Sequence, residues 1–164
     1  RQLGIALYAL KRDRLPTMKP WYRPRRLQRL VRVFRDRSRA RSGSASTVWR
    51  PGKGVIGMCV RDSADKWFSP SETWGPLSNH TAAKWAQKPE EVTLNMSFEE
   101  FGKHRGRHGF VMATPVLNDR GTVVGCVALD GPAGSAPTLT REPVRSALAA
   151  AAEIVGRFCP LLRS

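Results

Sequence analysis

The chain has 164 residues and a formal net charge of +15 at pH 7, with 28 Lys and Arg against 13 Asp and Glu. This length predicts one domain with a sizeable core, residues 1–164. The longest apolar run near the start, residues 4–10, is far shorter than the roughly 20 residues of a membrane-spanning helix. No signal peptide is visible and the chain begins with Arg1. We therefore expect a cytoplasmic piece of a larger protein, which a membrane anchor elsewhere in that protein could tether.

The excess positive charge is concentrated in the first quarter of the chain. Residues 11–42 contain thirteen Lys and Arg against two Asp, whereas the rest is nearly balanced. Prolines at 16, 20 and 24 exclude a helix or a central strand, so residues 11–26 are expected to form an exposed basic loop. Two interpretations of this charge stay open. It is either a solvated surface or one that binds nucleic acid, an anionic membrane or an acidic protein.

Four segments have the composition of β-strands. Residues 2–11 have apolar side chains on both faces, which favours a central strand, and residues 27–37 alternate between apolar residues and Arg. Residues 110–117 and 123–129 flank the turn sequence Asn-Asp-Arg-Gly and predict a hairpin. Strands that neighbour along the chain predict an antiparallel sheet.

Helices are expected between and after these strands. Glycines at 52, 54 and 57 predict a tight turn and a short helix up to residue 60, where turn and packing explain the glycines better than phosphate binding. Residues 131–137 are read as a Gly/Pro linker, and residues 139–158 have the apolar spacing of a long helix. The predicted apolar stripe of that helix consists of Val144, Leu148, Ala151, Val155 and Phe158.

Residues 61–109 are the least regular part, with three Trp and three Pro. We expect an ordered excursion that covers one side of the sheet. A short helix is predicted around residues 79–86, with Asn79 or Ser78 as its cap, and another from Ser97, which has the capping-box spacing to Glu100. The complete pattern predicts an α+β fold in which helices flank an antiparallel sheet.

Taken in order, these segments resemble a GAF domain. The resemblance rests on the strand-like residues 3–10 and 27–34, on the glycine turn Trp-Arg-Pro-Gly-Lys-Gly-Val-Ile-Gly at 49–57, and on the hairpin at 113–130, followed by the terminal helix. It implies a GAF/PAS-like sheet and a sensory or regulatory module. The basic loop lies outside the family pattern, and the Asn-Lys-Phe-Asp-Glu signature of the cyclic-nucleotide-binding members is absent. The cysteines also do not match the patterns of the bilin-attaching or methionine-sulfoxide-reducing members.

A pocket, if present, is expected beneath residues 61–109 and along the inner face of the hairpin. Its aromatic candidates could instead form a small core, and the cationic run 103–108 could either hold an anionic ligand or be a solvated turn. The candidate ligand-binding residues are Trp67, Trp74, Phe101, Arg105, His108, Met112 and Thr114.

The sequence contains no recognisable catalytic constellation. Cys59, Cys126 and Cys159 form no CxxC pair and are interpreted as buried apolar residues in a reducing compartment. The three histidines lack Cys or carboxylate neighbours at metal-ligand spacing. We therefore predict no enzyme activity, no metal and no cofactor.

Two functional hypotheses follow. The first is a GAF-like regulatory domain of a signalling protein, which binds a small molecule or forms a homodimer through residues 139–158. The second is a basic docking module that contacts nucleic acid, an anionic membrane or an acidic partner through residues 11–41. The cations assigned to that surface are Arg23, Arg25, Arg26, Arg29 and Arg32.

Overall fold

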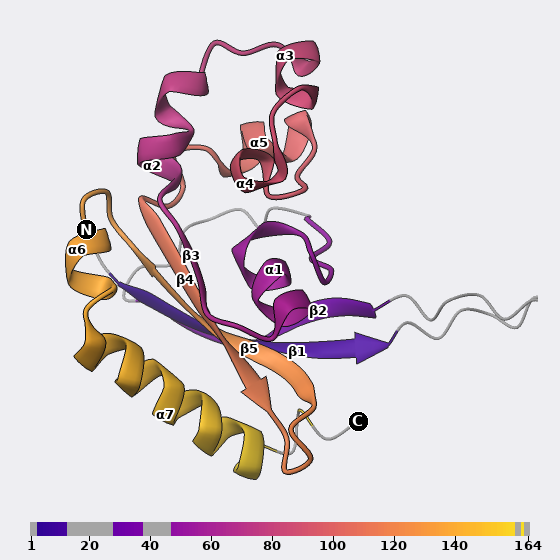
Figure 1. The fold of residues 1–164 in the computed structure, drawn as a ribbon, viewed down its shortest axis with the longest axis vertical. Coiled ribbons are helices and arrows are strands. Elements are labelled where there is room, and N and C mark those ends of the chain that lie inside the picture. Colours follow the sequence, from indigo (N-terminus) through magenta and orange to yellow (C-terminus); the bar gives the residue numbers. More distant parts are fainter. Residues whose placement is uncertain (1–2, 13–27, 38–46, 160–161, 163–164) are drawn as a thin grey trace, which may run out of the picture.

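A computed structural model of the chain describes residues 3–12, 28–37, 47–159 and 162. Its centre is a five-stranded antiparallel sheet with the strand order β2-β1-β5-β4-β3 (Figure 1). The strands are β1 (Gly4–Arg12), β2 (Gln28–Arg37), β3 (Lys66–Phe68), β4 (Phe110–Leu117) and β5 (Val123–Gly131). The predicted α+β class, the four predicted strands and the hairpin are confirmed. The short edge strand β3 was not predicted, because three residues carry too little alternation to be recognised.

The central position predicted for the first strand is also correct. β1 pairs with β2 on one side and with β5 on the other. Its odd-numbered residues Ile5, Leu7 and Ala9 belong to one hydrophobic cluster, and Tyr8 and Leu10 pack against the other. The strand is therefore apolar on both faces because each face has its own core.

Helices cover the two faces of the sheet separately (Figure 1). Helix α1 (Gly54–Asp62) packs on one face, and helices α6 (Ala136–Leu139) and α7 (Glu142–Phe158) pack on the other. The predicted linker at 131–137 thus contains the start of α6, and α7 begins three residues later than predicted. Within the described ranges, no helix has the length and apolar character needed to cross a membrane.

The buried side of α7 differs from the predicted stripe. Leu148, Ala152 and Gly156 are buried, whereas Phe158 is 72% exposed. A Cβ at Gly156 would lie 2.0 Å from the main-chain oxygen of Leu117, so the helix approaches the sheet most closely along its small residues. Close backbone approach, which sequence spacing does not reveal, set the orientation of the helix.

The excursion between β3 and β4 forms a compact helical subassembly on the α1 side of the sheet, beyond the end of α1 (Figure 1). It contains α2 (Pro70–Thr73), the 3-10 helix η1 (Gly75–Leu77), α3 (Ala82–Ala86), α4 (Glu90–Thr93) and α5 (Phe98–His104). The capping box at Ser97 is confirmed. The helix predicted at 79–86 begins only at Ala82, and its cap is Thr81, whose hydroxyl accepts a hydrogen bond from the Lys84 amide at 3.4 Å.

Three aromatic rings hold the excursion together. The ring centroid of Trp85 lies 4.2 Å from that of Phe101, and Trp74 meets Phe101 edge-on at 5.5 Å. The indole Nε1 of Trp74 donates to the Val92 carbonyl at 2.8 Å, and that of Trp85 to the Met96 carbonyl at 2.9 Å. Because both polar indole groups are satisfied, the rings can be buried without leaving an unpaired donor.

Candidate functional site

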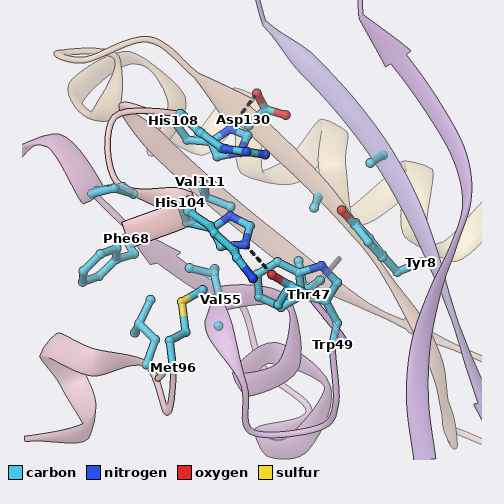
Figure 2. Close-up of a pocket in the computed structure, with 18 of the residues that line it drawn as sticks. Tyr8, Thr47, Trp49, Val55, Phe68, Met96, His104, His108, Val111 and Asp130 are labelled. Carbon is cyan, nitrogen blue, oxygen red and sulfur yellow. Dashed lines mark hydrogen bonds and ion pairs between the residues drawn. The ribbon is translucent and has the colours of Figure 1, made fainter. Parts of the chain in front are cut away.

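A pocket of about 650 Å³ lies between the sheet and the N-terminal half of α1 (Figure 2). This volume is within the range of small-molecule sites, roughly 300–1,000 Å³. Glycine conformations at the start of α1 shape one wall. Gly54 has a φ of 64°, and a Cβ there would lie 2.5 Å from the ring of Trp49, which also lines the pocket. Only glycine combines this backbone conformation with such close contact to an indole ring.

One end of the pocket is apolar. Val55 and Ile56 of α1, together with Phe68, Trp74 and Met96, line it. Trp74 and Met96 are also part of the buried cluster that includes α1. This end therefore offers a dry surface to an apolar part of a ligand.

The lining of the pocket carries more cations than acids. Among the residues that the structure describes, it includes five cations against one carboxylate, Asp130. Two of the cations come from β2, one from the last turn of α5 and two from the segment that follows it. They are Arg32, Arg35, Lys103, Arg105 and Arg107. The structure thus places the cationic run 103–108 in a pocket wall, but Lys103 is paired with Glu99 and Arg105 donates to the Ser78 carbonyl. Both interpretations of the run, an anion-binding site and a solvated turn, therefore stay predictions.

His108 and Asp130 are paired on the pocket wall, with His108 Nδ1 3.2 Å from Asp130 Oδ2 (Figure 2). The adjacent backbone sets this geometry, because the Gly109 amide donates to the Gly131 carbonyl at 3.0 Å and so aligns the two segments. Both side chains are mostly buried, with 24% and 16% exposure. A carboxylate at Nδ1 fixes the orientation of the ring and leaves Nε2 as the second polar atom of the imidazole.

His104, in the last turn of α5, also lines the pocket. Its Nε2 lies 2.8 Å from the Thr47 hydroxyl, and its ring centroid lies 5.1 Å from that of Trp49. Burial, together with the nearby Arg107 guanidinium, lowers the pKa of His104 to about 4. The imidazole is therefore neutral at pH 7, so it offers one donor and one acceptor and adds no charge.

Tyr8 brings a hydroxyl to the sheet side of the pocket. Burial raises the pKa of its phenol, and the Arg32 guanidinium opposes that rise, so the hydroxyl is protonated at neutral pH. It forms no hydrogen bond with any residue in the described part of the chain. A ligand in the pocket can therefore use it as a donor or an acceptor.

Of the seven predicted ligand-binding residues, Trp74, Arg105 and His108 line this pocket. The structure places the other four elsewhere. Phe101 lies in the aromatic cluster, 1% exposed, while Met112 and Thr114 are buried on β4. Trp67 is 52% exposed on β3, with Arg145 of α7 over its ring. Strand pairing explains the error, because Trp67 is the partner of Met112, whose cluster faces α7.

The predicted anionic-partner surface is described only in part. Arg23, Arg25 and Arg26 lie outside the described residues. Arg29 and Arg32 lie on β2, and of these two Arg32 lines the pocket. Binding of a nucleic acid, an anionic membrane or an acidic partner by this segment stays a prediction, as does a homodimer through residues 139–158.

The pocket residues that were not among the predicted ligand-binding residues include Tyr8, Thr47, Trp49, His104 and Asp130, of which His104 lies within the cationic run 103–108. Each looks ordinary in its local context, a strand tyrosine, a loop threonine or a carboxylate after an apolar run. Asp130 had one usable signal, a charged residue directly after the apolar hairpin strand. Its partnership with His108 is set by sheet register and carries no sequence signature.

The buried cysteines lie behind the pocket and do not line it. Cys59 is on α1, one helical turn after Ile56, and Cys126 is two residues before Ala128 on β5. Both are 0% exposed, as the sequence analysis expected, whereas Cys159, also expected to be buried, is only partly buried. Interaction with the Cys59 thiol, together with burial, raises the pKa of Cys126. The Cys126 thiol is therefore protonated, and both thiols are shielded from a ligand in the pocket.

Comparisons with known proteins identify the fold. Neither the protein-family models nor the curated proteins gave a match. Among solved structures, the reduced form of free methionine-R-sulfoxide reductase (fRMsr) of Staphylococcus aureus is similar, with a TM-score of 0.53 and 12% identity, over 94% of this chain and 70% of that one. Type II free methionine-R-sulfoxide reductase from Thermoplasma acidophilum is similar over 98% of this chain and 78% of that one, with a TM-score of 0.52 and 11% identity.

These structures correct the functional predictions. The neighbours share a GAF-like fold, which agrees with the predicted fold class, but they are reductases. The identification of the chain as a sensory or regulatory GAF domain is therefore wrong, and so is a docking module as its function. Binding of an anionic partner by the basic segment is a separate prediction, which this finding does not test. The prediction of no enzyme activity is contradicted by the same finding. At 11–12% identity these comparisons show a shared fold alone. The reaction of this chain is therefore a matter for a proposal.

Proposed function

We propose that this chain is an enzyme that reduces a small sulfoxide with thiols from a co-substrate, with the His108–Asp130 pair as its proton donor. The observation that carries the proposal is that pair, held on the wall of a pocket of small-molecule size. The reaction class comes from the neighbours of the same fold, whose titles name the reduction of free methionine-R-sulfoxide.

Reduction of a sulfoxide to a thioether consumes two thiols and releases a disulfide and water. Attack of the first thiolate on the sulfoxide sulfur requires protonation of the sulfoxide oxygen, which then leaves as water. In the proposal, protonated His108 gives the oxygen its first proton from Nε2, while Asp130 holds Nδ1 and orients the ring. The second thiol then attacks the bound thiol sulfur, which releases the thioether and the disulfide, and its proton completes the water. The proton lost by the first thiol returns His108 to its starting state. A positioned acid of this kind contributes roughly 10²–10⁴-fold to the rate.

The source of the thiols follows from the lining of the pocket. None of its described residues is a cysteine, and the two thiols nearest to its floor are fully buried. The chain therefore supplies the pocket and the proton, and two molecules of a small thiol, or one dithiol, supply the electrons. This distinguishes the proposed mechanism from one in which the protein itself forms the disulfide.

The test is a turnover assay on two sulfoxides, L-methionine-R-sulfoxide and its deaminated analogue 4-(methylsulfinyl)butanoate, with dithiothreitol as reductant and the thioether product measured by chromatography. We expect protein-dependent turnover that His108→Gln and Asp130→Asn reduce roughly 10²-fold or more. His80→Gln, at a histidine outside the pocket lining, is the matched control and keeps full activity.

The cysteine variants decide the electron source. Cys59→Ala and Cys126→Ala are expected to retain turnover as long as circular dichroism shows that they are folded. Failure of the protein to accelerate the reduction of either sulfoxide overturns the proposal. Loss of turnover in a folded cysteine variant would show that the chain uses its own thiols, which overturns the co-substrate mechanism.

A further inference from the structure

The position of the charges in the pocket bears on the class of substrate. Five cations line the pocket, and Asp130, the one carboxylate among the described lining residues, is already engaged by His108. Of the cations, Lys103 is paired with Glu99 and Arg105 donates to the Ser78 carbonyl. A ligand carboxylate in this lining finds cationic partners, whereas a ligand ammonium group finds no uncommitted acidic partner, so its desolvation is not compensated.

Two neighbouring groups on the sheet side of the pocket have the chemistry to bind an anion. Tyr8 and Arg32 are direct partners in the β1–β2 register, so their side chains lie next to each other on the same face of the sheet. Both line the pocket. The Tyr8 hydroxyl forms no hydrogen bond, and Arg32 no ion pair, with any part of the chain that the structure describes. A hydroxyl donor beside a guanidinium fork matches the oxygens of one carboxylate.

The apolar end of the pocket suits the remainder of such a ligand. Figure 2 shows Tyr8 on one side of the pocket and Phe68 and Met96 on the other, with His104 between them and His108 above in the view. A ligand whose carboxylate lies at Tyr8 and Arg32 would direct its tail toward Phe68 and Met96. Apolar groups are favoured there because the site already removes them from water.

We propose that this pocket selects a small apolar monocarboxylate and discriminates against the free amino acid with the same side chain. Tyr8 and Arg32 hold the carboxylate, and Phe68 and Met96 contact the tail. The inference rests on the proposed function only in taking this pocket as the substrate site. It differs from the neighbours' titles, which name a free amino acid.

The test measures binding alone, so it is independent of turnover. Isothermal titration calorimetry compares 4-(methylthio)butanoate, L-methionine, which differs by its ammonium group, and 4-(methylthio)butanamide, which lacks the negative charge. We expect the carboxylate to bind at least tenfold more tightly than either comparison ligand, because loss of one charge-assisted hydrogen bond costs roughly 1.5–3 kcal/mol, or about 10–100-fold in affinity.

Variants locate the subsite. Arg32→Gln is expected to weaken binding of 4-(methylthio)butanoate roughly tenfold or more, and Tyr8→Phe by several-fold, since each removes a direct partner of the carboxylate. Arg29→Gln is the matched control, because Arg29 lies on the same strand, is exposed and does not line the pocket. This variant keeps wild-type affinity.

The possible results separate the two proposals. Equal or tighter binding of L-methionine, or unchanged affinity in folded Arg32→Gln, overturns the inference even if sulfoxides are reduced. Selective binding of the monocarboxylate together with no turnover of either sulfoxide supports the inference and overturns only the proposed reaction. Faster turnover of 4-(methylsulfinyl)butanoate than of L-methionine-R-sulfoxide supports both.

Discussion

His104 makes the stability of this protein depend on pH in a way that can be calculated. Its pKa is about 4 in the folded protein, against roughly 6.5 in an unfolded chain. Well above pH 6.5 the imidazole is neutral in both states, so protonation of His104 does not lower the free energy of unfolding. As the pH falls from 6.5 toward 4, His104 binds a proton in the unfolded chain but stays neutral in the folded protein. The free energy of unfolding therefore decreases.

The size of the effect follows from the same values. Between pH 7.5 and pH 5 the full shift corresponds to a loss of about 2 kcal/mol in the free energy of unfolding. His104 is 9% exposed but borders a pocket, and water there screens part of the interaction. We therefore expect a loss of about 1–2 kcal/mol from this residue. The charged groups around the ring that act on it are Arg107, His108, Glu100 and Lys103.

The perturbation is His104→Leu, which keeps an apolar volume and removes the titration. Urea unfolding of wild type and variant at pH 7.5 and at pH 5 gives the pH-dependent change in the free energy of unfolding for each. The variant is expected to lose about 1–2 kcal/mol less than the wild type over this interval. Because the comparison uses the change with pH, the stability that leucine itself loses or gains cancels.

Two controls make the result decisive. His80→Leu removes a histidine outside the pocket lining and leaves the pH dependence due to His104 in place. His104→Gln retains a hydrogen-bonding side chain near Thr47 and serves if the leucine variant does not fold. The reasoning is refuted if the His104 variants and the wild type lose the same free energy between pH 7.5 and pH 5, or if NMR titration places the pKa of His104 at 6.5 or above.

Two further predictions concern the segments that shape the pocket. Gly57→Ala is expected to destabilise the protein by about 2 kcal/mol or more, because its Cβ would lie 2.1 Å from a main-chain oxygen, whereas Gly102→Ala, in an open part of α5, should stabilise it by roughly 0.5–1 kcal/mol. Ser97→Ala is expected to cost about 1 kcal/mol through loss of the capping box, with exposed Ser78→Ala near neutral. Urea unfolding checks both, and equal effects within either pair would contradict them.

Local patterns in the sequence were sufficient for most of the secondary structure. Strand β1 could be recognised as central because both of its faces are apolar, and the hairpin because turn-forming residues separate two apolar runs. The capping box at Ser97 was identified from spacing alone, since both of its hydrogen bonds lie within one helical turn. In each case the interaction that determines the structure joins residues close in sequence.

The candidate site could not be assembled in the same way. Met112 and Thr114 looked equivalent to residues of the pocket face, and only the pairing of β3, β4 and β5 shows that they are buried away from it. His108 and Asp130 are 22 residues apart and meet because Gly109 pairs with Gly131. No local signal reports such a contact.

The sequence by itself determined the sheet-forming segments, the fold class and the position of the cationic run 103–108. Those depend on side-chain periodicity and composition, which act over a few residues. The tertiary structure alone decided that this run faces a pocket, that Tyr8 adjoins Arg32, and that the cysteines lie behind the pocket floor. Strand register and helix packing set these relations between distant segments, and a one-residue change in register would have turned each side chain to the opposite face.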